Sequence, residues 1–545
     1  MSESLLLRHC RIPAGPWLPA APAEPTWVAI RGGRIVGVGE AGQPEPEAGF
    51  TPVELAGSVV LPGFVDAHTH LGWSAQDRWT VDLSGAGDRA QVLATVAAIA
   101  ARLPAGQWVV GGDWTAEGLP DAELPGRAEL DAATAGHPLF LVSRDHRVAL
   151  ANSAALARAK VDRHTPDPAG GVIEREAGEP TGLLRGGAVW ARLVAGVVPP
   201  RDRSRELAEI ADALADLAAR GITEVHDIGT FPERALGSPP PEFFRERSFT
   251  DVTLLAELDA RSPLSLRYSF RPSLLRVDEY TGRLPVLPER IRLAGFKMSL
   301  DNGWYSVDPE NRSESFRWPG LPEVVRLARI ADRHGLPVSV HAIGDLGVRE
   351  ALYLMGELPR RRPGVEAVHR IIHARRMAAA DIARCADLGV AVEVQPWEVV
   401  NSGARLTAMG DDAFAAGIGP FRALLDAGAA VLIGSDRRLG TRVDQRDTDP
   451  LTAVELCVTR SDGPETPIWQ PEQRISLTEA FAAAGTAGAI AAGARSRGRI
   501  APGQDADLVV LGADPWSLPP HQVHTARPVL TVSAGRIVFT DGVAA

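Results

Sequence analysis

Cysteine is scarce in this chain, which has only Cys10, Cys385 and Cys457 among its 545 residues. The three lie far apart and form no CxxC pair, so the sequence offers neither a disulfide framework nor a thiolate cluster for zinc. Disulfides are rare in reducing compartments, and the cysteine content therefore fits a cytoplasmic protein best. Any metal site has to use histidine, carboxylate or lysine side chains.

Long hydrophobic runs and an excess of basic residues are missing as well. No stretch reaches the roughly 18 consecutive apolar residues of a membrane-spanning helix, and Arg8 interrupts the apolar residues near the N-terminus. We therefore expect neither an export signal nor an integral membrane function. The chain has 68 acidic and 57 basic residues, a formal net charge of -11. Because such a charge repels a phosphate backbone, nucleic acid is not the expected partner.

The sequence does contain a repeated pattern of short apolar runs and amphipathic segments. Apolar residues recur with helical spacing in residues 203–219 and 322–333, and Gly221 and Gly335 stand where glycines end helices. Repeated strand-helix units predict a parallel sheet, and eight of them predict a closed TIM-type (β/α)8 barrel of the α/β class. The eight runs expected as strands are 59–70, 221–227, 264–270, 293–300, 336–343, 370–374, 390–395 and 430–436.

Two regions fall outside this repeat. Residues 77–200 separate the first two predicted strands by far more than one crossover helix needs, so we expect an inserted subdomain there. Residues 26–38 and 529–540 are both typical of β-hairpins and share the string Gly-Arg-Ile-Val. We expect the two termini to form one small β-sandwich domain, with a chance similarity of the two hairpins as the alternative. The predicted domains are thus 1–58 and 491–545 for the sandwich, and 59–490 for the barrel with its insertion.

Candidate metal ligands lie on or at the ends of the predicted strands. His68 and His70 are two residues apart in the first run, so both side chains face one side of a strand and can hold one metal ion. Further candidates in the fourth, fifth, sixth and eighth runs are Lys297, His341, His373 and Asp436. Because the C-terminal strand ends of a barrel share one face, these groups are expected to converge and to suit Zn²⁺ or a similar ion. A core position for His341 and a loop cap at Asp436 are the structural alternatives.

This pattern resembles the amidohydrolase superfamily, and within it the family 3 branch that includes the N-substituted formamide deformylases. Further strings similar to this branch are Asn152-Ser153-Ala154-Ala155-Leu156, Gly170-Gly171-Val172-Ile173-Glu174-Arg175, Gly178-Glu179-Pro180-Thr181-Gly182, Gly221-Ile222-Thr223 and His341-Ala342-Ile343-Gly344-Asp345. Residues 498–511 resemble the closing segment of the superfamily, so the resemblance spans nearly the whole chain. Two departures are Ile372, where an acidic residue is usual, and Arg437-Arg438-Leu439-Gly440, where smaller residues are usual.

The resemblance implies the roles of the candidate residues. One or two divalent ions, with Zn²⁺ expected, would bind to His68, His70, Lys297, His341, His373 and Asp436. Lys297 would be carboxylated by CO₂ and bridge two ions, whereas a buried pair with Asp301 is the alternative. Asp436 would take a proton from the attacking water and deliver it to the leaving nitrogen. Catalysis is thus assigned to Asp436 and His341.

The expected reaction is hydrolysis of a non-peptide carbon-nitrogen bond in a small molecule, namely an N-acyl, N-formyl or cyclic amide. The alternatives are deamination or another amidohydrolase-type reaction on a heterocycle, or metal-stabilised binding without catalysis, because fold alone does not decide the reaction. A homodimer is expected from the resemblance and from the commonness of two-fold assemblies.

Candidate substrate contacts lie near the predicted strand ends and in the insertion. The aromatic candidates, which could instead pack against the insertion, are Trp73, Trp304, Tyr305 and Trp397. His146 would polarise the substrate carbonyl or lie on the surface. Arg437 and Arg438 would receive a carboxylate or be solvated.

Overall fold

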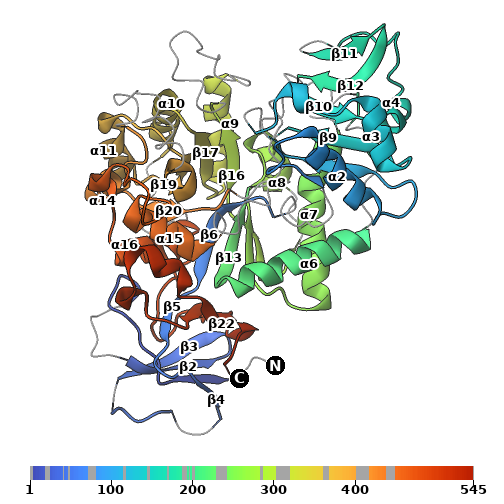
Figure 1. Cartoon of the computed structure of the whole chain (residues 1–545). Coiled ribbons are helices and arrows are strands. Elements are labelled where there is room, and N and C mark those ends of the chain that lie inside the picture. Colours follow the sequence, from blue (N-terminus) through green and yellow to red (C-terminus); the bar gives the residue numbers. More distant parts are fainter. Residues whose placement is uncertain are drawn as a thin grey trace.

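A computed structural model describes most of the chain (Figure 1). The described residues are 4–18, 25–40, 42–46, 49–71, 81–114, 118–143, 148–168, 171–186, 193–194, 197–198, 203–228, 242–282, 286–301, 320–359, 368–400, 417–436 and 449–543. Among them, no helix combines the length and apolar character that crossing a bilayer requires.

Parallel strands form the centre of the molecule in two neighbouring sheets. The first has the order β15-β14-β13-β6 and consists of β6 (Phe64–Thr69), β13 (Ile222–Asp227), β14 (Arg267–Phe270) and β15 (Ile291–Leu293). The second runs in chain order through β16 (Phe296–Ser299), β17 (Val338–Ala342), β18 (Arg370–His373), β19 (Ala391–Val394) and β20 (Val431–Ile433).

The two sheets meet along both edges. Lys297 N donates to Pro272 O over 2.8 Å, which joins β16 to the residues after β14, and Asp436 N donates to His68 O over 2.8 Å, which joins the end of β20 to β6. Strands that follow one another in chain order, with helices between them, give a TIM-barrel-like α/β fold. Among the described residues, however, strand pairing stops at two places and the predicted closed ring is not continuous.

Most predicted strands are shorter than expected, and three of them are divided or cut short for local reasons. The run 59–70 breaks at Gly63, where a Cβ would lie 2.3 Å from the side chain of Thr223. The run 293–300 breaks at Gly295, whose φ of 132° strongly favours glycine. In the run 430–436 the strand ends at Ile433, because Asp436 has a φ of 48°.

Helices follow most of the core strands. Helix α6 has the predicted bounds, and α9 begins one residue before the predicted start. Their bounds, in chain order, are α6 (Arg203–Ala219), α7 (Glu242–Arg261), α8 (Val277–Gly282), α9 (Leu321–Arg333), α10 (Asp345–Gly356), α11 (Ala379–Leu388), α14 (Phe421–Asp426), α15 (Pro450–Thr459), α16 (Leu477–Ala484) and α17 (Thr486–Ala491). Short 3-10 helices are η2 (Asp121–Glu123), η4 (Leu274–Arg276), η6 (Pro471–Gln473), η7 (Pro515–Ser517) and η8 (Pro520–Thr525).

Residues from both termini lie together at one end of the molecule (Figure 1). They form two four-stranded sheets, of order β3-β2-β1-β4 and β23-β22-β21-β5. The strands are β1 (Leu5–Arg8), β2 (Pro25–Arg31), β3 (Arg34–Glu40), β4 (Thr51–Glu54), β5 (Val59–Pro62), β21 (Leu508–Leu511), β22 (Pro528–Ser533) and β23 (Arg536–Thr540). Both predicted hairpins form, and their glycine turns meet on one residue: Ala506 N donates to Gly33 O and Gly535 N donates to Ala506 O, each over 2.9 Å.

Residues between β6 and β13 build a six-stranded sheet of order β11-β12-β10-β9-β8-β7. Its elements are β7 (Val81–Asp82), β8 (Val109–Gly112), β9 (Leu139–Val142), β10 (Val148–Ala151), β11 (Val172–Glu176), β12 (Glu179–Arg185), α2 (Arg89–Ala100), α3 (Arg127–Thr134) and α4 (Ser153–Arg158). The first residue of the string 152–156 has a structural task here. Asn152 caps α4 and accepts the N–H of Leu139 over 2.9 Å.

The three cysteines are free and buried. Because burial disfavours the thiolate, it raises the pKa of Cys10, Cys385 and Cys457 to about 12. They are therefore packing residues rather than nucleophiles or metal ligands.

Gly221 lies where Val509 of the terminal sheets packs against the core, and it provides a test of this packing. It has a φ of 80°, and a Cβ there would lie 2.6 Å from Val509 and 3.0 Å from Phe64. Gly221→Ala should lower the free energy of unfolding by about 2–4 kcal/mol, because a left-handed alanine and an overpacked contact both cost energy.

Gly335 is the matched control, because it also follows a helix and has a φ of 73° but has no neighbour within 4 Å of a Cβ. Gly335→Ala should cost only about 1 kcal/mol. Urea unfolding followed by circular dichroism measures both, and equal losses would refute the close contact.

Candidate metal centre

The candidate ligands on β6, β17 and β18 converge with Asp436 at one edge of the core. Oδ1 of Asp436 lies 3.3 Å from Nε2 of His68 and 3.4 Å from Nε2 of His70. The ring centroid of His373 lies 5.4 Å from that of His68 and 4.4 Å from that of His341. All five side chains are buried. The structure thus brings together residues that the sequence spreads over more than three hundred positions.

Lys297 lies within β16 and is only 8% exposed. Burial lowers the pKa of His373 and raises that of Glu393 to about 7, and the positive charge of Lys297 lowers both pKa values. The carboxylate of Asp301 accepts the N–H groups of Ile343 and Gly344 at 2.8–3.0 Å and lies 3.5 Å from Nε2 of His341. Asp301 therefore helps to hold His341 and the loop that follows it.

Two of the candidate ligands have unusual backbone conformations. His373 has a φ of 73° and Asp436 a φ of 48°, in the left-handed region that non-glycine residues rarely occupy. Such a conformation costs on the order of 1–3 kcal/mol and persists only where surrounding contacts fix it. A site tolerates such an unfavourable backbone conformation where it is needed to position the side chains.

Asp66 fixes the conformation around Asp436. Its carboxylate accepts the hydroxyl of Ser435 at 2.7 Å, the N–H of Ser435 at 2.9 Å and the N–H of His68 at 3.2 Å. Burial nevertheless raises the pKa of Asp66 to about 6, while these hydrogen bonds lower it. Asp66 thereby links the strand of the histidine pair to the segment that carries Asp436.

Strand β19 and the residue that follows it contribute two side chains that sequence reasoning missed. Oε1 of Glu393 lies 2.5 Å from Nδ1 of His68, and Oε1 of Gln395 lies 2.8 Å from Nδ1 of His373. A signal was present in the sequence, because two polar residues spaced by two stand inside the apolar run 390–395. Burying such groups is costly unless they have partners, so they mark a functional face.

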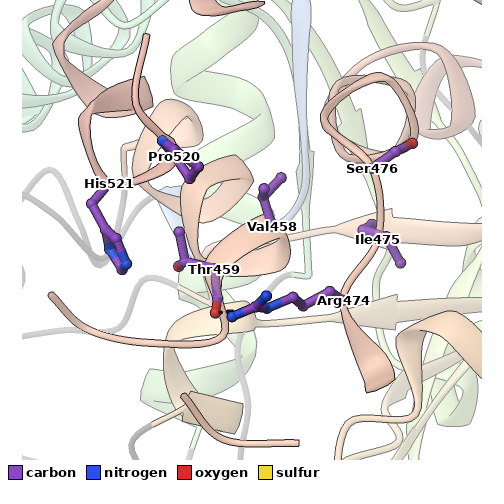
Figure 2. A pocket seen from close by; sticks show the side chains of 7 residues that line it. All are labelled: Val458, Thr459, Arg474, Ile475, Ser476, Pro520 and His521. Atoms are coloured by element: carbon purple, nitrogen blue, oxygen red, sulfur yellow. Dashed lines mark hydrogen bonds between the residues drawn. The ribbon is translucent and has the colours of Figure 1, made fainter. Parts of the chain in front are cut away.

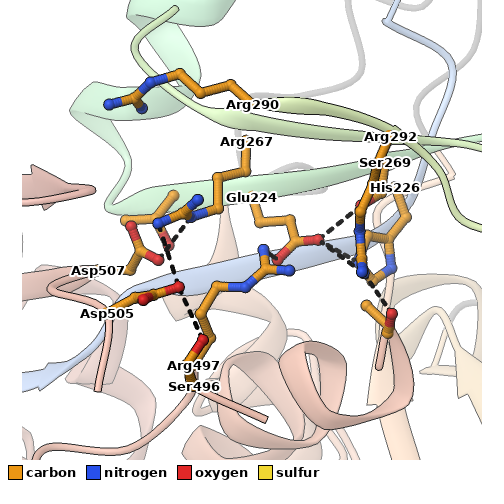
Figure 3. A network of polar contacts seen from close by, with 12 residues as sticks. Glu224, His226, Arg267, Ser269, Arg290, Arg292, Ser496, Arg497, Asp505 and Asp507 are labelled. Atoms are coloured by element: carbon orange, nitrogen blue, oxygen red, sulfur yellow. Dashed lines mark hydrogen bonds and ion pairs between the residues drawn. The ribbon is translucent and has the colours of Figure 1, made fainter. Parts of the chain in front are cut away.

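A buried polar network continues from Glu393 toward the C-terminal segment. Nη1 of Arg370 lies 3.9 Å from Oε2 of Glu393 and 3.0 Å from Nδ1 of His226. His226 Nε2 lies 3.2 Å from Oε1 of Glu224, which also pairs with Arg497 (Figure 3). Burial lowers the pKa of His226 well below its usual value, and Arg370 adds to this, so the ring is neutral.

The donor atoms fit a divalent cation. Ligand atoms of His68, His70 and Asp436 lie within 4.8 Å of one another, and so do those of His373, Glu398 and Asp436. Glu398 already pairs with Arg375, so the first group is the better ligand set. Burial lowers the pKa of His373 well below its usual value although Asp436 raises it, and a neutral imidazole is the form that binds metal. Two imidazoles and one carboxylate are a donor set that suits zinc and similar ions.

The remaining predicted residues lie around this edge or outside the described part. Trp397 is half-buried and follows Gln395 by two residues. Ile372, which replaces the usual acidic residue, is fully buried beside His373. The predicted contacts Trp73, His146, Trp304, Tyr305, Arg437 and Arg438 lie outside the described residues.

A separate cavity of about 490 Å³ is formed by residues of α15, of η8 and of the segment before α16 (Figure 2). It is lined by Val458, Thr459, Arg474, Ile475, Ser476, Pro520 and His521. None of these residues belongs to the strands that carry the candidate ligands, so this cavity is distinct from the metal centre.

Gly434 provides a test of the geometry at the joint between β6 and β20. A Cβ at this position would lie 2.6 Å from Cβ and 2.8 Å from N of His68. Gly434→Ala should therefore displace His68 relative to Asp436 and weaken metal binding by about 10–100-fold, the range typical of disturbed ligand support. Metal content after dialysis against graded chelator is the measurement.

The control is Gly85→Ala, at an exposed loop glycine with no atom within 4 Å of a Cβ. It should retain metal as the unaltered protein does. Unchanged metal binding in Gly434→Ala would show that the joint does not position the ligands.

Known proteins resemble this chain over most of its length. It is 28% identical over 518 residues to the putative amidohydrolase YtcJ of Bacillus subtilis, with 91% of both chains covered. It is also 28% identical over 515 residues to the N-substituted formamide deformylase of Arthrobacter pascens, with 90% of both covered. The fold matches that of an uncharacterized metal-dependent hydrolase from Pyrococcus horikoshii, with a TM-score of 0.71, 20% identity, and 95% and 99% of the two chains covered.

A family model confirms the resemblance seen in the sequence. The model described as the amidohydrolase family matches residues 52–539, which include every candidate metal ligand. The match therefore extends from the N-terminal sheet through the core to the last strand. This chain belongs to the amidohydrolase family and is a hydrolase of carbon-nitrogen bonds.

Proposed function

We propose that this enzyme hydrolyses a non-peptide carbon-nitrogen bond of a small molecule, in an N-acyl, N-formyl or cyclic amide. The observation that carries the proposal is the buried carboxylate of Asp436, which lies 3.3 and 3.4 Å from two imidazole nitrogens. The residues proposed to hold one or two divalent ions, with Zn²⁺ the expected metal, are His68, His70, Lys297, His341, His373 and Asp436.

The side chains have complementary tasks in this proposal. A divalent ion, when bound, supplies positive charge that polarises a carbonyl and acidifies water. Asp436 accepts the proton of the attacking water on a carboxylate oxygen and then gives it to the leaving nitrogen. His341 lies near the carboxylate of Asp301 and beside His373, among the other proposed ligands. The proton transfer matters because an unprotonated amide nitrogen is a poor leaving group.

Composition supports a special task for Lys297. Lys160 and Lys297 are the only lysines in a chain with 57 basic residues, and the buried cations around the core interior, Arg271 and Arg370, are arginines. A guanidinium has a pKa above 12, whereas a lysine amine can lose its proton when buried and then react. We therefore propose that the neutral amine of Lys297 adds CO₂ and releases a proton, and that the resulting carbamate would hold two divalent ions.

The finer predictions from the sequence belong to the same proposal. They are one closed eight-stranded barrel, an inserted subdomain over 77–200, a β-sandwich formed by both termini, a cytoplasmic location and a homodimer. The two sheet contacts at Lys297 and Asp436 support closure, and the shared contact of both hairpins with Ala506 supports a joint terminal unit.

A substrate panel tests the reaction class. The metal-loaded protein is incubated with formamides, acyl amides, lactams and amino-heterocycles, and the release of amine or ammonia is measured. The likeness to a formamide deformylase over 90% of both chains favours amine release from an amide. Ammonia from a heterocycle would favour deamination, and no product from any compound would contradict amide hydrolysis.

Replacing Asp436 by Asn tests the proton transfer. Asp436→Asn keeps an oxygen ligand but removes the base, so turnover should fall about 10²–10⁴-fold while metal content stays unchanged. Asp381→Asn is the matched control, because Asp381 is a buried carboxylate on α11 that pairs with Arg349. Near-normal turnover in Asp436→Asn would refute the assignment.

Replacing Lys297 by Met tests the bridge. Lys297→Met should lower the metal content from two ions to one per chain, because the bridging oxygen ligand is lost. Lys160→Met, at an exposed position, should leave it unchanged. With only two lysines, amine labelling followed by peptide mass analysis should modify Lys160 but spare Lys297. A content of one ion beside a labelled Lys297 in the unaltered protein would exclude the bridge.

A further inference from the structure

We propose that Glu393 is a positioning residue that sets the ring orientation and the protonated nitrogen of His68, and that β19 is the strand that holds this ligand in place. The inference rests on the proposed metal centre, since His68 is a ligand there. Strand β19 carries none of the predicted ligands, yet Glu393 on this strand and Gln395 directly after it contact two of them.

The contact between Glu393 and His68 is short and buried. Nδ1 of His68 lies 2.5 Å from Oε1 of Glu393, and the two side chains are 2% and 0% exposed. Nε2 of the same ring faces Asp436 at 3.3 Å. Both ring nitrogens therefore have defined surroundings, and no solvent competes for either.

Hydrogen-bond chemistry fixes which nitrogen carries the proton. A neutral imidazole has one N–H and one lone pair, and a carboxylate oxygen only accepts. Burial raises the pKa of Glu393 to about 7, while the charges of Arg370 and Lys297 lower it. In its ionised form Glu393 only accepts, so the proton lies on Nδ1 of His68 and the lone pair of Nε2 points toward Asp436. A second partner of this kind orients a metal-binding histidine and raises its basicity.

Gln395 and Arg370 lie on two sides of Glu393. Nε2 of Gln395 donates to Oε1 of Glu393 over 3.4 Å, and its Oε1 faces Nδ1 of His373. Nη1 of Arg370 lies 3.9 Å from Oε2 of Glu393, so the second oxygen faces a buried cation. An amide at position 393 would present N–H donors to this guanidinium, which explains why the charge matters as well as the acceptor.

Arg370 connects this arrangement to the rest of the polar network. Arg370 contacts His226, which in turn contacts Glu224. The carboxylate of Glu224 accepts a hydrogen bond from Oγ of Ser269 over 2.7 Å and pairs with Arg497 (Figure 3). The neighbouring pair of Arg267 and Asp507, at 2.8 Å, is a separate branch that does not include Arg370. The position of Glu393 is therefore determined by a chain of buried contacts rather than by one neighbour.

The test compares Zn²⁺ affinity in variants of the full chain, measured by competition with a chromogenic chelator. Glu393→Leu removes the acceptor and should weaken Zn²⁺ binding about 10–100-fold. Glu393→Gln keeps one oxygen acceptor but not the charge, so its affinity should lie between those of Glu393→Leu and the unaltered protein. The absorption spectrum of the Co²⁺ form should shift in the same order, because it reports the ligand field directly.

Val394→Ala is the matched control, since Val394 is buried on the same strand and has an apolar side chain. It should lower the thermal midpoint of the metal-free protein but leave Zn²⁺ affinity and the Co²⁺ spectrum unchanged. The thermal midpoint of each Glu393 variant shows whether it is folded, and Glu393→Gln remains informative if Glu393→Leu fails to fold.

His68→Ala separates this inference from the metal centre itself. Loss of Zn²⁺ in His68→Ala together with unchanged affinity in both Glu393 variants would overturn the positioning role and leave the centre intact. Unchanged affinity in His68→Ala would overturn the centre and the inference with it. Graded loss in the order Leu, Gln, Glu at position 393 supports the proposal.

Discussion

The joint between β6 and β20 is the constraint on which the site depends. Asp66 accepts three hydrogen bonds from Ser435 and His68, and the backbone of Asp436 donates to His68. These contacts join segments separated by more than 360 residues of chain and bring the carboxylate to the histidine pair. Gly434 permits the approach, because any side chain there would overlap with His68. The left-handed backbone of Asp436 is the local cost of this joint.

Much of the site could be predicted from sequence, because the C-terminal ends of parallel strands all lie at the same edge of the sheet. His68, His70, His341 and His373 lie where that rule places them. Asp436 does not lie on a strand, since β20 ends three residues earlier, and its position depends on hydrogen bonds that residues 435 and 436 donate to β6. Such contacts between distant segments leave no periodic signal. Asp436 was still predicted because it ends the apolar run 430–436, whereas Glu393 was missed although its place in an apolar run was visible.

The divided strands show a second limit of sequence reasoning. Gly63 and Gly295 stand in apolar runs that look continuous, but each glycine faces a neighbour from a distant segment, Thr223 and Pro337. Periodicity describes the chain alone, whereas these breaks arise from what the chain packs against. The hairpins were predictable because their turn chemistry is local. Their meeting at Ala506 is set by residues far from either turn.

The division at Gly63 has a consequence for how this protein can vary. β5 pairs with β21 in the terminal sheet, and β6 continues from it directly to His68 and His70. A single stretch of eleven residues, 59–69, therefore spans both units, and Arg497 reaches from the C-terminal segment to Glu224 in the core interior. The terminal sheets therefore cannot be exchanged for those of a relative without changing contacts in the core. In recombination between related genes, they and the catalytic core have to be inherited together.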